Sequence, residues 1–263
     1  MSSTLQFGDE SSRRIEAIYG TPDVVAQRQA VRDALAVEPG ERVLDIGAGP
    51  GFLAAELAVC AAPNGVVIGT DVSESMLAIA AARLGSAGDA ELRFEHADAC
   101  ALPFADASFD AVVSTQVYEY VTDIAVALQE LARVLRPGGR ALVLDTDWDS
   151  IVWHSRDPSR MRRILDAWVE HLVDPHLPRR LIRLLSDAGL TVDLCQVVPI
   201  VNVGSNHNTY SAGMTELIAD FVAGRQGLTQ ADAAAWSEDL NDLSRSGDYF
   251  LSLNRYLFRA AKR

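Results

Sequence analysis

The stretch that decides the fold is Val43-Leu44-Asp45-Ile46-Gly47-Ala48-Gly49-Pro50-Gly51. Its apolar run with one carboxylate predicts a buried strand, and the three alternate glycines predict a turn directly after it. Leu53, Leu57 and Cys60 then recur at helical spacing, so the glycines join a strand to a helix. Glycine permits positive φ and removes the Cβ atom that would hold a ligand away, and a helix start offers unpaired amides. We therefore expect a nucleotide-sized binding site at this junction.

Outside this stretch, strand and helix patterns alternate along the chain. Helical patterns over residues 10–36 are interrupted at Gly20-Thr21-Pro22, and Pro39-Gly40 turns the chain into the first strand. This rhythm predicts an α/β fold, a doubly wound and mostly parallel sheet with helices on both faces. Further strands are expected at residues 66–71, 92–96, 109–115, 140–145, 191–201 and 249–260, and further helices at 73–84 with Ser73 as N-cap, 124–135, 157–173, 181–188, 210–223 and 229–243.

Composition narrows the class of protein. The chain has 263 residues, 49% of them hydrophobic, which is enough for a sizeable core. A formal net charge of −13 argues against nucleic acid and anionic membrane surfaces as partners. Three scattered cysteines suit a reducing compartment, and neither a signal-like start nor a run of about 18 apolar residues is found. We expect a cytoplasmic protein, monomer or homodimer, with no nucleic-acid or membrane partner.

The glycine spacing discriminates between cofactors. A dinucleotide fingerprint would need a glycine where Phe52 stands, and a triphosphate-binding loop would need a lysine, which residues 47–60 lack. What remains is a D-x-G-x-G-x-G turn, or a strand-to-helix turn without any ligand. With this turn the chain resembles the class I methyltransferases that depend on S-adenosylmethionine (SAM).

Four signatures make the resemblance more specific, because they occur in the same order in the ubiquinone/menaquinone-biosynthesis-like branch. The resemblance covers residues 43–139 and implies a seven-stranded Rossmann-like sheet with an antiparallel last strand. It further implies a single domain, with an N-terminal helical lid at 1–36, a cofactor-binding half at 37–149, and a cap and substrate-binding half at 150–263. The signatures are Leu44-Asp45-Ile46-Gly47-Ala48-Gly49-Pro50-Gly51, Leu102-Pro103-Phe104, Ser108-Phe109-Asp110 and Leu135-Arg136-Pro137-Gly138-Gly139.

The nucleoside of SAM sets demands that the sequence can meet. Asp71 ends the second strand, where a carboxylate can accept both ribose hydroxyls, although it could instead cap a helix. Asp98 could accept from the adenine amine while the Ala99 amide donates to the ring. Val72 and Met76 could pack on the ring faces, and Met76 could equally be plain core.

The methionine end of SAM carries an ammonium and a carboxylate. Gly47 and Ala48 could supply carbonyls, within a turn that also includes Gly49 and Gly51. Asp45 is costly inside a strand unless it organises the loop amides or a bound cation. Arg28 could pair with the SAM carboxylate and Tyr19 could close over it, or they could be an exposed Arg and a core Tyr.

The acceptor side is expected after the fourth and fifth strands. Gln116 and Tyr118 follow the fourth strand, where in this family the methyl group meets substrate; we assign Gln116 to the cofactor and Tyr118 to the substrate. Trp148 begins an aromatic stretch and is assigned to the substrate as well. Because position and orientation can do most of the work, a base is needed only for a weak nucleophile, and His154 is the histidine best placed in sequence, ahead of His207.

Other site types are disfavoured. Asp145, Asp147 and Asp149 alternate like a calcium loop, but Ser150 and Arg156 stand where its glycine and closing Glu are needed, so no metal is expected. The motifs of amino-group and pyrimidine DNA methylation are absent.

The resemblance thus implies transfer of a methyl group from SAM to an O, N or C atom of a small, partly apolar metabolite. Two alternatives stay open at this point. One is a SAM-binding protein that does not methylate, a cyclase-like enzyme or regulator. The other is a nucleotide-sugar or nicotinamide enzyme, against which Phe52 argues.

Overall fold

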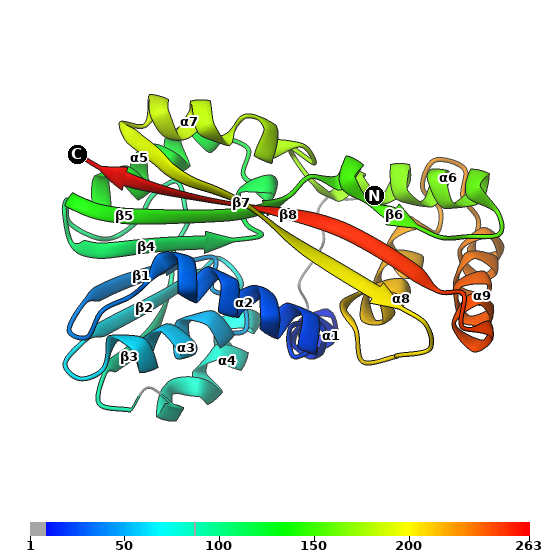
Figure 1. Ribbon diagram of the computed structural model, residues 1–263, viewed down its shortest axis with the longest axis horizontal. Helices are drawn as coiled ribbons and strands as arrows, with labels where there is room; N and C mark the ends of the chain where they lie inside the picture. Colours follow the sequence, from blue (N-terminus) through cyan, green and yellow to red (C-terminus); the bar gives the residue numbers. More distant parts are fainter. Residues whose placement is uncertain (1–8, 87) are drawn as a thin grey trace.

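The computed structural model describes residues 9–86 and 88–263, which fold around one twisted sheet (Figure 1). Part of the expected lid, residues 1–8, lies outside the described residues. Within them the strands lie in the order β3-β2-β1-β4-β5-β8-β6, and β7 also pairs with β8. The strands are β1 Arg42–Ile46, β2 Val66–Asp71, β3 Glu91–His96, β4 Phe109–Thr115, β5 Leu135–Thr146, β6 Val152–Trp153, β7 Leu190–Val203 and β8 Phe250–Lys262.

The directions of the strands confirm the doubly wound prediction. β1 to β5 run parallel, and β8 runs antiparallel to its neighbours β5, β6 and β7. Eight strands are found in the described residues instead of the seven expected, because Val152–Trp153 adds a two-residue strand beside β8. Such a strand is too short to give a period-two pattern. The strand order reverses between β1 and β4, the place where open α/β sheets bind ligands.

Helices cover both faces of the parallel part (Figure 1). On one face α2 and α3 bury Val31 and Leu57 against strand residues such as Val43. On the other face α5 and α7 bury Leu128 and Leu185 in a separate cluster. These helices are α2 Pro22–Leu35, α3 Phe52–Ala61, α5 Ile124–Val134 and α7 Leu181–Asp187, while α4 Glu74–Ala80 lies against β2 and β3.

A second group of helices gathers at the far ends of β7 and β8. Figure 1 shows these two strands running from the parallel sheet to α1, α6, α8 and α9. Ile200 and Leu253 from the strand ends join Trp168, Ile218 and Trp236 in one buried cluster. The helices are α1 Asp9–Tyr19, α6 Pro158–Trp168, α8 Tyr210–Val222 and α9 Gln230–Ser246.

The helix and strand limits in the structure differ from the predicted ones at the end of α4 and at the start of β5. Ser73 caps α4 as predicted, since its hydroxyl accepts from Met76 N at 3.3 Å, but the helix tightens into a 3₁₀ helix after Ala80. β5 begins at Leu135 instead of the expected Arg140, because Leu135 pairs with Phe109 ahead of a register shift. The 3₁₀ helices are η1 Ala81–Ser86, η2 Tyr118–Tyr120, η3 Trp148–Ser150, η4 Val169–His171 and η5 Leu177–Arg179. Among the described helices, none combines the length and the apolar character that crossing a membrane requires.

Candidate active site

A cavity of about 550 Å³ lies at the carboxyl ends of β1, β2 and β4, and residues of α1 and α8 also line it. Its volume is within the range of about 300–1,000 Å³ that is usual for small-molecule sites. This cavity is lined by most of the site residues that we predicted from the sequence. Three of the predicted residues, Gly51, Tyr118 and His154, do not line it. Those that do are Tyr19, Arg28, Asp45, Gly47, Ala48, Gly49, Asp71, Val72, Met76, Asp98, Ala99, Gln116 and Trp148.

The glycine turn and Asp71 are in direct contact. Gly49 N donates to Asp71 Oδ2 at 2.9 Å, and Ser73 N donates to Oδ1 at 2.8 Å. A Cβ atom added at Gly49, whose φ is +53°, would meet nothing within 4 Å, whereas one at Gly47 would lie 2.2 Å from a methyl group of Val117. Gly49 therefore presents bare backbone to the cavity, and Gly47 is required by packing inside the protein.

Asp45 lies beneath this turn with an unsatisfied oxygen. It is 1% exposed, and its Oδ2 atom has no hydrogen-bond partner among the described residues. Burial, and then the charge of Asp71, raise the pKa of Asp45 to about 8. At neutral pH the carboxyl group is therefore largely protonated, and a cation or a set of donors beside Oδ2 would favour its charged form.

The wall beside Asp71 has an apolar part and a polar part. Val72 is 62% exposed and Met76 is buried, and both line the cavity. Asp98 accepts from Cys100 N at 2.8 Å, which fixes the short turn that also presents Ala99. The arrangement offers a flat ligand two apolar side chains and a polar edge.

Arg28 and Tyr19 connect α1 and α2 to the cavity. Arg28 is buried; its Nε donates to Glu56 Oε1 at 2.9 Å and its Nη1 donates to the Tyr19 carbonyl at 2.6 Å. Its guanidinium also lies 4.8 Å from the centre of the Phe52 ring. Arg28 is thus held in place as part of the protein's own structure while it borders the cavity.

The segment after β4 turns sharply at Gln116. This residue has φ of +58°, a strained value for a side chain other than glycine. Its backbone N–H donates to the Leu144 carbonyl at 2.7 Å, and the Thr146 hydroxyl donates to its side-chain Oε1 at 2.6 Å. The turn leads into η2, which places Glu119 and Tyr120 on the cavity wall.

Comparisons with known proteins give this geometry a family. Residues 44–143 match the family model described as "Methyltransferase domain". Residues 44–143 thus form a methyltransferase domain. An uncharacterized 37.1 kDa transposon protein of Streptomyces fradiae is 38% identical over 194 residues, 72% of this chain and 54% of that protein. A demethylmenaquinone methyltransferase of Clavibacter sepedonicus is 44% identical over 118 residues, 45% of this chain and 46% of that protein. The chain therefore spans about half the length of each of these relatives.

The fold of the methyltransferase domain also occurs in solved structures. Phosphoethanolamine N-methyltransferase 2 of Haemonchus contortus, solved in complex with S-adenosyl-L-methionine, aligns with a TM-score of 0.63 and 22% identity. The alignment covers 100% of this chain and 60% of that one. At this identity the likeness concerns the fold alone.

The side of the cavity around Glu119 lies partly outside the methyltransferase match and contains residues that sequence reasoning missed. Glu119 is 1% exposed, and its Oε2 accepts from Trp148 Nε1 at 3.0 Å. Arg255 is 2% exposed, donates from Nη1 to Gln27 Oε1, and lies 4.8 Å from the centre of the Tyr210 ring. All five of these side chains line the cavity, together with Trp168, Met214 and Leu217.

One of these omissions had a signal in the sequence. Leu251, Leu253 and Leu257 are buried at alternate positions of β8, and Arg255 occupies the same buried face. A charged residue on the buried face of a strand indicates a functional site, because such residues are rarely buried without a partner. For Glu119 there was no signal, because the turn of η2 decides which of its neighbours faces inward.

Three expected site residues lie elsewhere. An added Cβ at Gly51 would lie 2.7 Å from the Phe94 ring, so Gly51 serves packing within the domain. Tyr118 is fully buried in the core under α5 and borders a separate small cavity, so the direct substrate contact that we expected has no geometric support. His154 is exposed beside β6, outside the cavity, and the base role that we gave it likewise lacks support.

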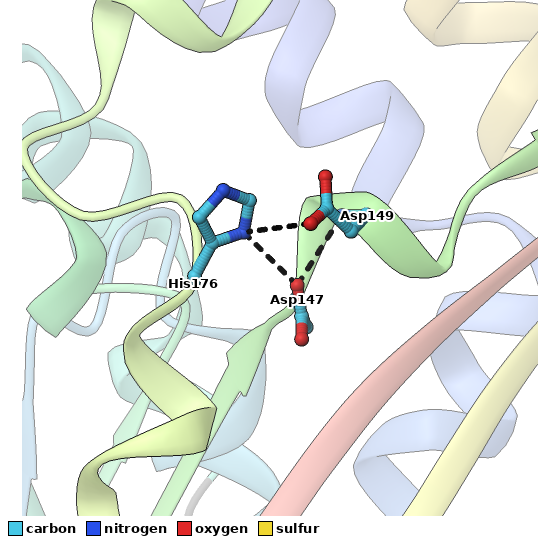
Figure 2. Close-up of side chains that lie close together, drawn as sticks. All are labelled: Asp147, Asp149 and His176. Carbon is cyan, nitrogen blue, oxygen red and sulfur yellow. Dashed lines mark hydrogen bonds and ion pairs between the residues drawn. The ribbon is translucent and has the colours of Figure 1, made fainter.

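Figure 2 shows a cluster of Asp147, Asp149 and His176 next to η3, whose ligand atoms lie within 4.8 Å of one another. Arg179 donates to Asp147 at 2.7 Å and to Asp149 at 2.6 Å, and His176 Nδ1 lies 3.1 Å from Asp147 Oδ1. Burial opposes the charge on Asp147, but the hydrogen bonds from Arg179 and His176 outweigh it, so its pKa is lowered. The carboxylates thus have a cationic partner from the protein itself.

Proposed function

We propose that the protein transfers the methyl group of SAM to an O, N or C atom of a small, partly apolar metabolite. The methyltransferase domain over residues 44–143 supports the reaction class. The observation that carries the proposal is the hydrogen bond between Gly49 N and Asp71 Oδ2, because it places bare backbone and a carboxylate side by side on the cavity wall.

The residues of this wall fit SAM part by part. Asp71 offers its carboxylate to the ribose hydroxyls, while Val72 and Met76 offer apolar surface to adenine. The open space at Gly49 lets a ligand lie against the main chain. Asp45 has an oxygen without a partner, which can accept from the ammonium group of the methionine end. When bound, SAM supplies a methyl group that is attached to a positively charged sulfur. The sulfur is the leaving group and becomes a neutral thioether.

The remaining surface supports a small acceptor with an apolar body. Trp148, Trp168 and Tyr210 line the end of the cavity under α8, with Met214 and Leu217 from that helix. One relative is named for demethylmenaquinone, and we carry over from it only the class, a small metabolite with apolar parts. We further propose that α1 and α2 serve as the lid and that the segment after Asp149 supplies the cap.

Calorimetric titration with SAM and with its demethylated product S-adenosylhomocysteine tests the proposal. We expect both to bind the wild-type protein and Asp71→Ala to weaken binding by at least about tenfold, since hydrogen bonds to a charged group are lost. Asp33→Ala, an equal truncation on an exposed face of α2, is the matched control and should bind as wild type does.

Product analysis by mass spectrometry then separates methylation from other uses of SAM. S-adenosylhomocysteine should accumulate in step with a methylated acceptor when candidate metabolites are supplied. No binding by the wild-type protein, or equal binding by Asp71→Ala, would contradict the site; turnover of an acceptor without demethylated cofactor would contradict the reaction.

A further inference from the structure

We propose that Glu119 is the general base of the methyl transfer and takes the proton that the acceptor loses. The proposal rests on the proposed function, but it concerns a side chain of this protein on the acceptor side of the cavity. A group in this role must border the reaction space, be held in one orientation, and be able to change protonation state near neutral pH.

The position of Glu119 meets the first two requirements. It lies in η2, which follows β4 after two residues, and it lines the same cavity as the glycine turn at the end of the neighbouring β1. Among the described residues, Trp148 is the one side chain that donates to its carboxylate, at 3.0 Å to Oε2. Trp148 is a neutral donor, so it orients the carboxylate without neutralising it, and a second oxygen remains to accept from a ligand.

The charges around Glu119 set its proton affinity. Burial raises the pKa of Glu119 to about 7, against the hydrogen bond from Trp148 and the attraction of Arg255, and with a contribution from Asp174. A carboxyl with this pKa is partly deprotonated at neutral pH and can return its proton to solvent between turnovers. The titratable and charged groups that face it are Asp145 from β5, Arg255 from β8, Asp174 before η5, Tyr19 from α1, Tyr120 from η2 and Tyr210 from α8.

The side chains next to Glu119 indicate which kind of acceptor molecule would donate a proton to it. Trp148 and Trp168 lie edge to face with ring centres 6.1 Å apart, and both border the cavity. Such walls suit an acceptor whose hydroxyl is attached to an apolar ring. In the step, the acceptor's O–H bond breaks and its proton goes to the Glu119 carboxylate. An oxygen electron pair forms the new bond to the methyl carbon, while the pair of the breaking carbon–sulfur bond stays on sulfur.

Calorimetry with two probes of one shape tests the role without knowledge of the natural acceptor. Naphthol and the corresponding methylnaphthalene are titrated separately into protein saturated with S-adenosylhomocysteine. We expect wild type to bind naphthol about tenfold more tightly than methylnaphthalene, since the hydroxyl donates to a carboxylate. Glu119→Gln should reduce this preference, because a neutral amide oxygen accepts a weaker hydrogen bond than a carboxylate does. Glu216→Gln, the same exchange on an exposed face of α8, should retain the preference in full.

The pH dependence distinguishes a base from a merely structural residue. In wild type the affinity for naphthol should rise with pH through about 7, because the deprotonated carboxylate is the acceptor. In Glu119→Gln it should be flat, since an amide does not titrate in this range. If methylated naphthol forms, its rate should fall by about 10² or more in the variant, with S-adenosylhomocysteine affinity unchanged.

Trp148→Phe provides a second variant that keeps the base and removes the donor that orients it. It should retain the pH-dependent preference with a higher midpoint, because the hydrogen bond that lowers the pKa of Glu119 is gone. Naphthol that does not bind to wild type, equal affinity in wild type and Glu119→Gln, or a persisting rise with pH in Glu119→Gln would overturn the proposal. A wild-type protein that does not bind S-adenosylhomocysteine would instead contradict the proposed function.

Discussion

The two sides of the cavity are built in different ways. The side around Asp71 comes from short segments at the ends of β1 and β2, and it presents main-chain groups of the glycine turn, which the hydrogen bond from Gly49 links to Asp71. The side around Glu119 is assembled from segments far apart in the chain, with Trp148 after β5, Tyr210 on α8 and Arg255 on β8. The first side uses backbone geometry, and the second uses side-chain chemistry.

This difference explains why the similarity to known methyltransferases is concentrated where it is. The family match ends at residue 143, and most residues of the second side, among them Trp148, Tyr210 and Arg255, come after it. A cofactor-binding site built from main-chain groups can be combined with many different acceptor sites, because the contacts to the acceptor come from other elements. We therefore expect changes on the two sides to have separable effects on SAM binding and on turnover.

The largest effect should come from the two glycines of the turn, which differ in what surrounds them. Gly47→Ala places a Cβ 2.2 Å from Val117 at a φ of +70°, so we expect a loss of about 2–4 kcal/mol in the free energy of unfolding. Gly49→Ala meets no protein atom and should cost only the left-handed backbone strain of about 1–2 kcal/mol, while weakening SAM binding. Urea unfolding and calorimetry separate the two; a stable Gly47→Ala protein would show that the turn is not packed as described.

Arg255→Met should lower turnover and leave SAM binding intact. The guanidinium lowers the pKa of Glu119 and of Asp145 by its charge, so its removal should move the rising limb of the pH–rate profile to higher pH. We expect a loss of about tenfold or more at neutral pH, corresponding to about one pKa unit. A thermal melt checks that the variant is folded, and an unshifted profile would argue against this arrangement of charges.

Asp45→Asn should flatten the dependence of stability on pH. Because burial raises the pKa of Asp45 from 3.8 to about 8, the folded protein binds more protons than the unfolded chain between these values. Its stabilising contribution is fully present below the lower value and is lost as pH rises toward 8, by at most about 1.4 kcal/mol per pH unit. Urea unfolding of wild type and variant across this range measures the difference. Parallel curves would mean that Asp45 ionises normally in the folded protein.

His154→Ala should have the smallest effect. The side chain is exposed beside β6 and outside the cavity, so both stability and turnover should stay within about 0.5 kcal/mol of wild type. A large loss of turnover, measured beside Glu119→Gln with the same acceptor, would return the base role to the histidine that the sequence alone favoured.

The success of sequence reasoning followed the same division. The strand, the glycine turn and Asp71 could be predicted because adjacent residues determine them, and the alternation of strands and helices determined the sheet. Tyr118 was a candidate and Glu119 was not, because the sequence does not specify which residue of a 3₁₀ turn lines a cavity. Trp168 and Tyr210 could not be predicted as wall residues, because their place depends on how the helices at the ends of β7 and β8 pack together.

One cavity should hold the nucleoside at Asp71 and direct the reacting methyl group toward Glu119. A crystal structure with S-adenosylhomocysteine bound tests it most directly. We expect the ribose on the Asp71 carboxylate, the amino-acid end beside Gly47 and Gly49, and the sulfur directed toward the aromatic walls. A ligand bound outside this cavity, or a ribose without contact to Asp71, would contradict it.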